Sequence, residues 1–404
     1  MGITAPAAPA SERIAFLDAL RGFALLGIFL ANIQVFSGWI FMPEEGQIAL
    51  AGAEETMWQH RLHKIFIDGK FYTLFSLLFG AGFALQLERL TRRGADGLTI
   101  YRRRVLILLG IGLVHSWLIW DGDILTLYAL MGLILPAFYR LSDRALLAWS
   151  AVLIFAVPFA GVAIVQALGV SPDAGLLALS DRVAIALGAT DPKDAVGWLR
   201  REAFAGWLSW VVSGPIFAWG LKVASWRIPK VLGIMVLGIW LGRRLAAGTL
   251  LDDRRLLWRV FWAGLLVGVP ASIAYGFQPG NLQSDWRSLI GTVPLALAYA
   301  CAFALAWPHA QRWLGIFAAP GRMALTNYLA QSVICIAVFY GIGLGQVGRW
   351  PPASIYAFAL GLFAAQLLFS RWWLSHHGQG PMEALWRRWT YGAKQPLTGT
   401  PATL

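Results

Sequence analysis

Charged residues are scarce in this sequence. Only 13% of the 404 residues are Asp, Glu, Lys or Arg, whereas 58% are hydrophobic and 21 are tryptophan. So small a charged fraction excludes an ordinary soluble domain and is typical of polytopic membrane proteins. No stretch is polar enough to form a soluble domain of its own. We therefore predict a single transmembrane domain over residues 14–392, between a loose N-terminal tail (1–13) and a C-terminal tail (393–404).

Cysteine is scarce as well. The two cysteines, Cys301 and Cys335, both lie in apolar runs and have no metal-like spacing around them. They support neither a disulfide framework nor a redox centre, and we expect no bound metal. A basic, signal-like start is missing too, and the first apolar run is too long for the core of a signal peptide. We expect that run to be retained as the first span.

Acidic residues are outnumbered by basic ones. The chain has 21 Asp and Glu against 33 Lys and Arg, which gives a net charge of +12. The basic residues lie in short clusters between apolar runs, as they do in the cytoplasmic loops of membrane proteins. We therefore expect the lipid bilayer as a partner and no nucleic acid.

Long apolar runs are what the sequence does contain. About twenty residues cross the hydrocarbon core as a helix, and fewer suffice where flanking residues snorkel. Ten runs meet this requirement: 14–36, 69–87, 105–120, 124–140, 145–169, 228–243, 258–277, 288–307, 323–344 and 353–374. A further candidate, 204–221, is interrupted by glycine and proline. The predicted fold class is all-α, a polytopic integral membrane helix bundle of about ten transmembrane helices, or eleven if 204–221 spans.

The arginines orient this bundle. If 204–221 does not span, most basic residues fall on one side, including the clusters Arg89–Arg104 and Arg243–Arg259. The positive-inside rule then places that side, with both termini, in the cytoplasm. We expect a multi-pass protein of the bacterial cytoplasmic (inner) membrane, with 204–221 as a re-entrant or interfacial piece of an external region.

A hairpin between two spans carries the most suggestive polar residues. His115 lies inside the apolar run Val105–Trp120, and Asp121 and Asp123 follow in the turn to the next span. Ionisable residues within a span are costly and often functional, and a carboxylate from either aspartate can orient the histidine at the external side. In the alternative interpretation, His115 bonds a carbonyl of a neighbouring helix and the aspartates only line a solvated turn.

The first external loop holds further candidates. His60 and His63 could bind a metal, but no third ligand stands nearby at an obvious spacing, and histidines in such a loop are usually solvated. Lys70, at the external entrance of the next span, is a candidate substrate contact together with Asp68 and Asn32. The alternative for Lys70 is a lysine that snorkels to the interface.

Polar residues also gather at the cytoplasmic side. Asp18 and Arg21 lie three apart on one helical face and can simply pair with each other. Arginine suits phosphate groups, so Arg21, Arg322 and Arg387 are candidate contacts to a phosphate-bearing cofactor.

One span carries a polar stripe. Asn327 and Gln331 lie one turn apart on the same face of the run 323–344. Such a stripe either lines a cavity or joins neighbouring helices.

Several segments together resemble the YeiB-like family of bacterial membrane proteins, whose shared domain has no settled function. They are Leu17-Asp18-Ala19-Leu20-Arg21-Gly22 with Asn32, Lys70-Phe71 through Phe79-Gly80-Ala81-Gly82, His115 with Trp120-Asp121-Gly122-Asp123-Ile124-Leu125, Gly321-Arg322-Met323-Ala324-Leu325-Thr326-Asn327-Tyr328, and Gly380-Pro381 with Glu383-Ala384-Leu385-Trp386-Arg387. The resemblance covers nearly the whole chain, in order.

More distantly, the Asp-x-x-Arg-Gly of the first span resembles the transmembrane acyltransferase superfamily, which includes heparan-α-glucosaminide N-acetyltransferase. That resemblance implies transfer of an acyl group from cytosolic acyl-CoA across the membrane, with a histidine in the first external loop, where His60 or His63 stands here. This sequence departs from the pattern at the next helix, where Gly69-Lys70-Phe71-Tyr72-Thr73-Leu74-Phe75 replaces an aspartate-led motif.

These observations favour an integral membrane acyltransferase that uses a coenzyme A thioester as co-substrate. The external acceptor, whether glycan, lipid or small molecule, stays open, and so does a homo-oligomeric state. The alternative function is a transporter or lipid-handling membrane protein without catalysis. The residues in named roles are His115 as general base with Asp123 or Asp121, then His60 and His63; Arg21, Asp18, Arg322, Asn327, Gln331 and Arg387 around the coenzyme; and Asn32, Lys70 and Asp68 around the acceptor.

Overall fold

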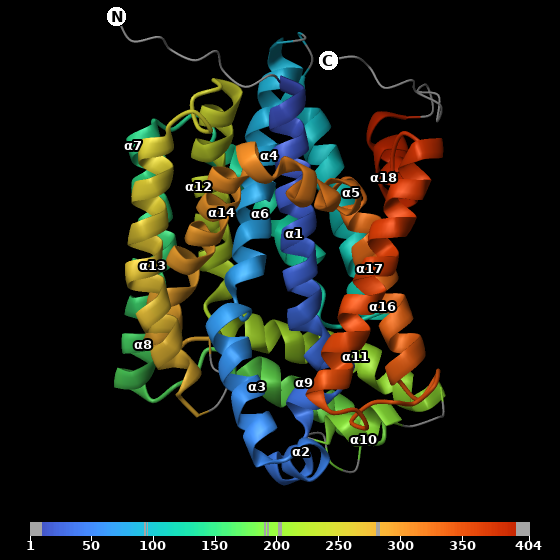
Figure 1. Ribbon diagram of the computed structural model, residues 1–404. Coiled ribbons are helices and arrows are strands. Elements are labelled where there is room, and N and C mark those ends of the chain that lie inside the picture. Colours follow the sequence, from blue (N-terminus) through green and yellow to red (C-terminus); the bar gives the residue numbers. More distant parts are fainter. Residues whose placement is uncertain are drawn as a thin grey trace, which may run out of the picture.

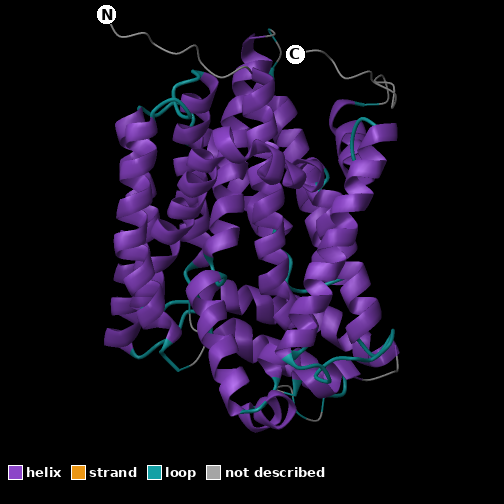
Figure 2. Cartoon of the chain, viewed as in Figure 1, coloured by secondary structure: helices purple, strands orange, loops and turns teal. Residues whose placement is uncertain are grey.

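The computed structural model describes residues 10–92, 94, 96–189, 191, 194–200, 204–279 and 283–392. Within these ranges every regular element is a helix (Figure 2), as predicted. The predicted C-terminal tail, 393–404, and residues 1–9 of the predicted N-terminal tail lie outside the described residues.

Every predicted apolar run contains a helix. The helices are α1 (Ala10–Phe36), α2 (Glu44–Ala51), α3 (Ala53–Phe66), α4 (Lys70–Arg92), α5 (Gly97–Leu118), α6 (Leu125–Ile134), α7 (Asp143–Ala151), α8 (Val157–Leu168), α9 (Ala174–Ala186), α10 (Ala195–Arg200), α11 (Phe204–Ala224), α12 (Arg227–Ala246), α13 (Arg254–Gly276), α14 (Trp286–Leu314), α15 (Ala318–Arg322), α16 (Ala324–Phe339), α17 (Pro352–His376) and α18 (Pro381–Tyr391). Single turns of 3₁₀-helix lie at Trp39–Phe41, Leu135–Ala137 and Gly315–Phe317, and a π-helical segment, Val152–Ala156, joins α7 to α8.

The lengths and composition of these helices are those of a multi-pass membrane protein. Six helical segments of the described chain are long and apolar enough to cross a bilayer, or up to seven if one bent pair forms a single span. That pair is α11 and α12, which are bent by 68° where they meet. Two further apolar helices, Leu125–Ala137 and Ala324–Phe339, are shorter.

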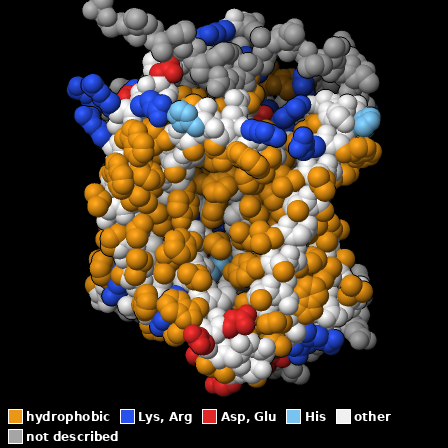
Figure 3. Space-filling view, viewed as in Figure 1, with side chains coloured by type: hydrophobic (Ala, Val, Ile, Leu, Met, Phe, Trp, Pro, Cys, Tyr) orange, Lys and Arg blue, Asp and Glu red, His pale blue; other side chains and the backbone are white. Residues whose placement is uncertain are grey.

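Most of the long helices run side by side along one direction (Figure 1). Helix α1 begins and α18 ends at the same end of this bundle, here called the upper end, while α2, α3, α9, α10 and α11 gather at the lower end (Figure 1). Between the two ends hydrophobic side chains form a belt, which is hollowed near its centre on the face drawn in Figure 3. Charged side chains concentrate at both ends, as expected where lipid surrounds the middle.

Glycine allows α4 and α12 to pack with their backbones in contact. A Cβ atom at Gly80 would lie 2.0 Å from the carbonyl oxygen of Met235, and one at Gly238 would lie 2.4 Å from that of Leu77. Small residues let helices approach closely, so that dispersion contacts can hold them together within lipid. Gly82, by contrast, faces open space.

Candidate functional site

His115 joins three elements deep inside the bundle. Its Nδ1 lies 3.0 Å from Oδ1 of Asp123, and its Nε2 lies 2.9 Å from Oγ of Ser332 on α16. The histidine side chain is 0% exposed, so it does not face lipid. A carboxylate, an imidazole and a hydroxyl therefore stand in one hydrogen-bonded line, an order that also serves nucleophilic catalysis.

Asp123 is fixed by the start of α6. Its Oδ1 accepts the backbone N–H of Leu125 at 3.0 Å, and its Oδ2 accepts that of Thr126 at 2.7 Å. These bonds cap the first turn of α6 and hold the carboxylate in place. A carboxylate only accepts, so Nδ1 of His115 donates to Asp123 and Nε2 faces the Ser332 hydroxyl. That hydroxyl also donates to the backbone oxygen of Tyr328 at 3.4 Å.

Asp121 turns the other way. Its Oδ1 accepts the indole N–H of Trp210 on α11 at 2.9 Å. The carboxyl group is buried in the turn between α5 and α6, and this burial raises its pKa above the ordinary value. The two aspartates left open by the sequence thus have different partners, and Asp123 is the one that meets His115.

Ser332 was not predicted as a site residue, although it lies beside the predicted polar stripe of α16. It follows Tyr328 by one helical turn, and the Tyr328 ring lies 5.1 Å from the His115 ring. The signal that could have found it is this second polar face, Tyr328 with Ser332, next to the Asn327 face.

The predicted stripe itself joins α16 to α17. The side-chain amide of Asn327 donates to Ser370 at 3.0 Å, and that of Gln331 donates to Gln366 at 2.8 Å. Gln366 donates back to the backbone oxygen of Asn327 at 3.0 Å. All four side chains are buried, so in this structure the stripe links two helices.

Asp18 and Arg21 pair with each other on α1, at 2.7 Å. Arg322 donates to the backbone oxygen of Gly378 at 3.0 Å. The segments that carry Asp18 and Arg322 nevertheless meet at Gly321. A Cβ atom at Gly321 would lie 1.8 Å from the carbonyl oxygen of Asp18. Helices α1 and α15 are therefore in direct backbone contact at the upper end.

The last helix, α18, closes this end. Oε1 of Glu383 accepts the backbone N–H groups of Leu325 and Thr326 at 2.8 and 3.1 Å, and so supplies the cap that α16 lacks at its own start. The Trp386 indole donates to the backbone oxygen of Arg104 at 2.8 Å. Arg387 is exposed on the same helix.

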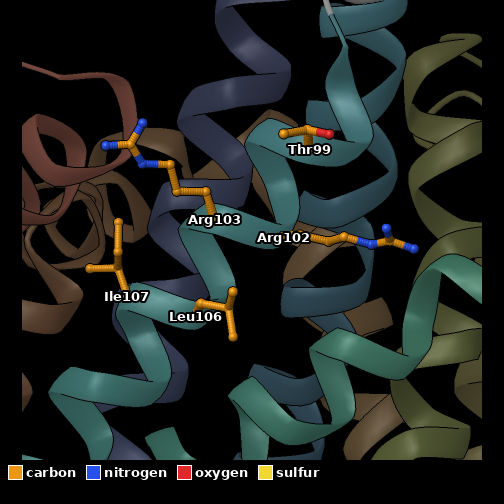
Figure 4. A pocket seen from close by; sticks show the side chains of 5 residues that line it. All are labelled: Thr99, Arg102, Arg103, Leu106 and Ile107. Atoms are coloured by element: carbon orange, nitrogen blue, oxygen red, sulfur yellow. The ribbon is translucent and has the colours of Figure 1, made fainter.

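Two open grooves flank α5 at the upper end, and neither was predicted. One, of about 590 Å³, lies between α5 and α18 and is lined by Arg103, Ile107, Leu385, Arg388, Trp389 and Gly392. The other, of about 420 Å³, is lined by Thr99, Arg102, Arg103, Leu106 and Ile107 (Figure 4). Arg102 and Arg103 extend to different sides of the helix (Figure 4). Their guanidinium groups give both grooves a positive edge.

The segment predicted to be the first external loop is largely helical, so the expectation of freely solvated histidines there is wrong for His63. Its Nδ1 lies 2.9 Å from the hydroxyl of Tyr356 on α17. The oxygen of that hydroxyl accepts from the side-chain amides of Gln34 at 2.7 Å and Gln59 at 3.2 Å. Helix α3 is amphipathic, and the face that carries Gln59 and His63 packs inward. His60 is half-buried on the same helix.

The predicted acceptor contacts are dispersed. Asp68 accepts from the hydroxyl of Tyr275 at 3.0 Å and from the amide of Gln283. Lys70 is 0% exposed and donates to the backbone oxygen of Lys64, so it is not a snorkelling lysine. Asn32 is half-buried on α1.

The fold and these contacts define a multi-pass helical membrane protein with buried polar groups that join helices distant in sequence. Residues 241–393 match the family model described as "Protein of unknown function (DUF418)". The chain is 31% identical over 402 residues to "Uncharacterized protein YxaH" of Bacillus subtilis (strain 168), covering 96% of each chain. It is 30% identical over 421 residues to "Uncharacterized protein YeiB" of Escherichia coli (strain K12), covering 95% of this chain and 98% of that one. The chain belongs to the YeiB-like family, as its motifs predicted.

Proposed function

We propose that the protein is an integral membrane acyltransferase, which moves an acyl group from a cytosolic coenzyme A thioester to an acceptor at the external side. One observation carries the proposal: the hydrogen-bonded line from Asp123 through His115 to Ser332 inside the bundle. A general base between a carboxylate and a hydroxyl is the arrangement that activates a nucleophile for acyl transfer.

The proposed reaction has two steps. Ser332 Oγ attacks the thioester carbonyl and forms an ester, while its proton passes to Nε2 of His115 and from there to the leaving thiolate. An acceptor hydroxyl or amine then attacks the acyl-serine, and His115 takes the acceptor's proton and returns it to Ser332 Oγ. Asp123 holds the ring orientation and offsets the charge of the imidazolium in both steps.

Arginines of the upper end are the proposed contacts to the phosphates of coenzyme A. Guanidinium groups bind phosphate oxygens in pairs, and Arg103 and Arg388 line the groove between α5 and α18. Arg21 and Arg322 stay candidates from the sequence. Asn327 and Gln331 are less suited to this role because each is bonded to α17.

The function is tested by incubating the purified full-length protein with acetyl-CoA and longer acyl-CoA thioesters. We expect release of free thiol and a mass increase of one acyl group on the peptide that contains Ser332. If neither product forms while the protein stays folded, the proposal is contradicted.

A transporter or lipid-handling protein without catalysis is the second candidate, and the bend between α11 and α12 favours it. Broken helices line substrate sites in many transporters. Uptake of a solute or lipid into proteoliposomes without any thiol release would favour this candidate.

We also propose ten spans, with the upper end and both termini in the cytoplasm and α11 as an external re-entrant or interfacial piece. The Arg102–Arg104 cluster at the upper end and the cross-lying α11 at the lower end support this topology (Figure 1).

Reporter fusions are expected to place both Arg104 and Lys394 in the cytoplasm, because ten spans return the chain to its starting side. A periplasmic phosphatase and a cytoplasmic fluorescent protein, fused in parallel at each site, measure this. An external report from Lys394 alone would make 204–221 an additional span.

A further inference from the structure

Buried basic side chains collect where α11 meets α12. Lys222 and Lys230 are only 6% and 3% exposed, and Arg227 opens α12 between them. Among the residues that the structure describes, none of these three forms an ion pair within 4 Å. Lys222 donates to the backbone oxygen of Ala218 at 3.4 Å, which supplies no opposite charge. A buried cation without a counter-charge is costly, so proteins rarely keep one without a use.

The three cations share one region. Arg227 lies within electrostatic range of both Lys222 and Lys230. Lys222 is also within range of Asp121 and Asp123, the turn that holds His115. The bend of 68° between α11 and α12 lies between Lys222 and Arg227.

The carboxylates nearby are already engaged. Asp68 accepts from Tyr275 and Gln283, Asp121 from Trp210, and Asp123 from His115. The basic groups around them outnumber these three: Lys64, Lys70, Lys222, Arg227 and Lys230.

Arg227 also presents an unused donor. Its Nη2 donates to Gln283 at 2.9 Å and its guanidinium lies 5.1 Å from the centroid of the Tyr72 ring. Its buried Nε has no hydrogen-bond partner among the described residues. An ionised, buried donor without an acceptor is what a bound anion would satisfy.

We propose that Lys222, Arg227 and Lys230 bind a phosphate group. A phosphate group offers three terminal oxygens to these three basic side chains, whereas a carboxylate offers only two. If the proposed acyl transfer is correct, this site holds a phosphate-bearing acceptor near the turn that contains Asp121 and Asp123. This part of the inference rests on the proposed function. The phosphate belongs either to a lipid headgroup or to a soluble molecule, and the two sources are separated by experiment.

The site is tested by thermal unfolding of the purified full-length protein in an uncharged detergent. The added probes are inorganic phosphate, phosphatidic acid and, as a neutral-headgroup comparison, phosphatidylcholine. We expect concentration-dependent stabilisation by a phosphate probe and not by phosphatidylcholine. Stabilisation by both phosphate probes indicates that the site recognises the phosphate itself. Stabilisation by phosphatidic acid alone indicates that it recognises a lipid headgroup.

Replacement of each lysine by methionine tests whether the basic side chains bind the phosphate probe. Lys230→Met and Lys222→Met should each weaken binding of the phosphate probe at least about 10-fold, as loss of one charge-assisted bond does, whereas Lys230→Arg should retain most of it. Without any probe, Lys230→Met should melt at a higher temperature than the parent, because an unpaired buried charge is removed. The exposed Arg255→Met on α13 is the matched control and should change neither quantity.

The proposed site would be refuted if neither phosphate probe stabilised the protein. It would also be refuted if the parent, Lys222→Met and Lys230→Met bound the probe equally well. These measurements do not use acyl-CoA. A failed acylation of Ser332 would therefore refute the transferase without altering them, and a failed phosphate response would leave the acylation assay unaffected.

Discussion

Replacement of Asp123 by asparagine is expected to lower the thiol-release rate by roughly 10³–10⁴-fold, the loss seen when the carboxylate of a catalytic triad is made neutral. Asparagine keeps the size of the side chain and can still accept the N–H of Thr126. It cannot offset an imidazolium, and an amide N–H directed at Nδ1 of His115 would force the other ring nitrogen to carry the proton. Nε2 would then no longer accept from Ser332.

His115→Ala and Ser332→Ala are expected to abolish release as well, and the double variant should be little worse than either, because the three groups act as a unit. Ser370→Ala is the matched control, since Ser370 is an equally buried serine that bonds Asn327 on the other face of α16. Its turnover should stay within a few-fold of the parent. Full turnover by Ser332→Ala would show that this hydroxyl is not the nucleophile.

Gly321→Ala is expected to destabilise the protein severely. The added Cβ would lie 1.8 Å from the carbonyl oxygen of Asp18, which is backbone and cannot rotate away. Relief requires α1 and α15 to separate, and the cost should reach or exceed the ~1–3 kcal/mol typical of overpacked cores. Thermal unfolding in detergent and the yield of monodisperse protein measure the effect.

Gly82→Ala supplies the control, because a Cβ atom there meets nothing within 4 Å. Alanine is the better helix former by about 0.5–1 kcal/mol, so this variant should be as stable as the parent or slightly more so. Equal melting temperatures for Gly321→Ala and Gly82→Ala would contradict the tight crossing of α1 and α15.

Features that depend on residues close in sequence could be predicted. Apolar runs of membrane-spanning length marked the helices, because the hydrocarbon core imposes that length. His115 and Asp123 lie only eight residues apart across a tight turn, so a contact of His115 with Asp121 or Asp123 could be predicted, but not which of the two makes it. The number of spans was harder to predict, because α6 is ten residues long and continues as a 3₁₀ turn at Pro136.

Contacts between distant segments could not be read from local patterns. Ser332 is 217 residues from His115, and Tyr356 is 293 residues from His63. Which faces of two helices meet depends on the packing of all the others, and a serine within an apolar run carries no sign of its partner. The basic residues Lys222, Arg227 and Lys230 were not predicted as a site, although they lie within nine positions of the sequence.

The Glu383 cap bears on how the chain is completed during biosynthesis. Thr326 and Glu383 are 57 residues apart, so α16 leaves the ribosome and enters the membrane well before its cap is made. Until α18 emerges, the first N–H groups of α16 have no side-chain acceptor from their own helix. Ser332 lies within this same helix, so the helix that carries the proposed nucleophile receives its N-terminal cap only after the last helix has been synthesised.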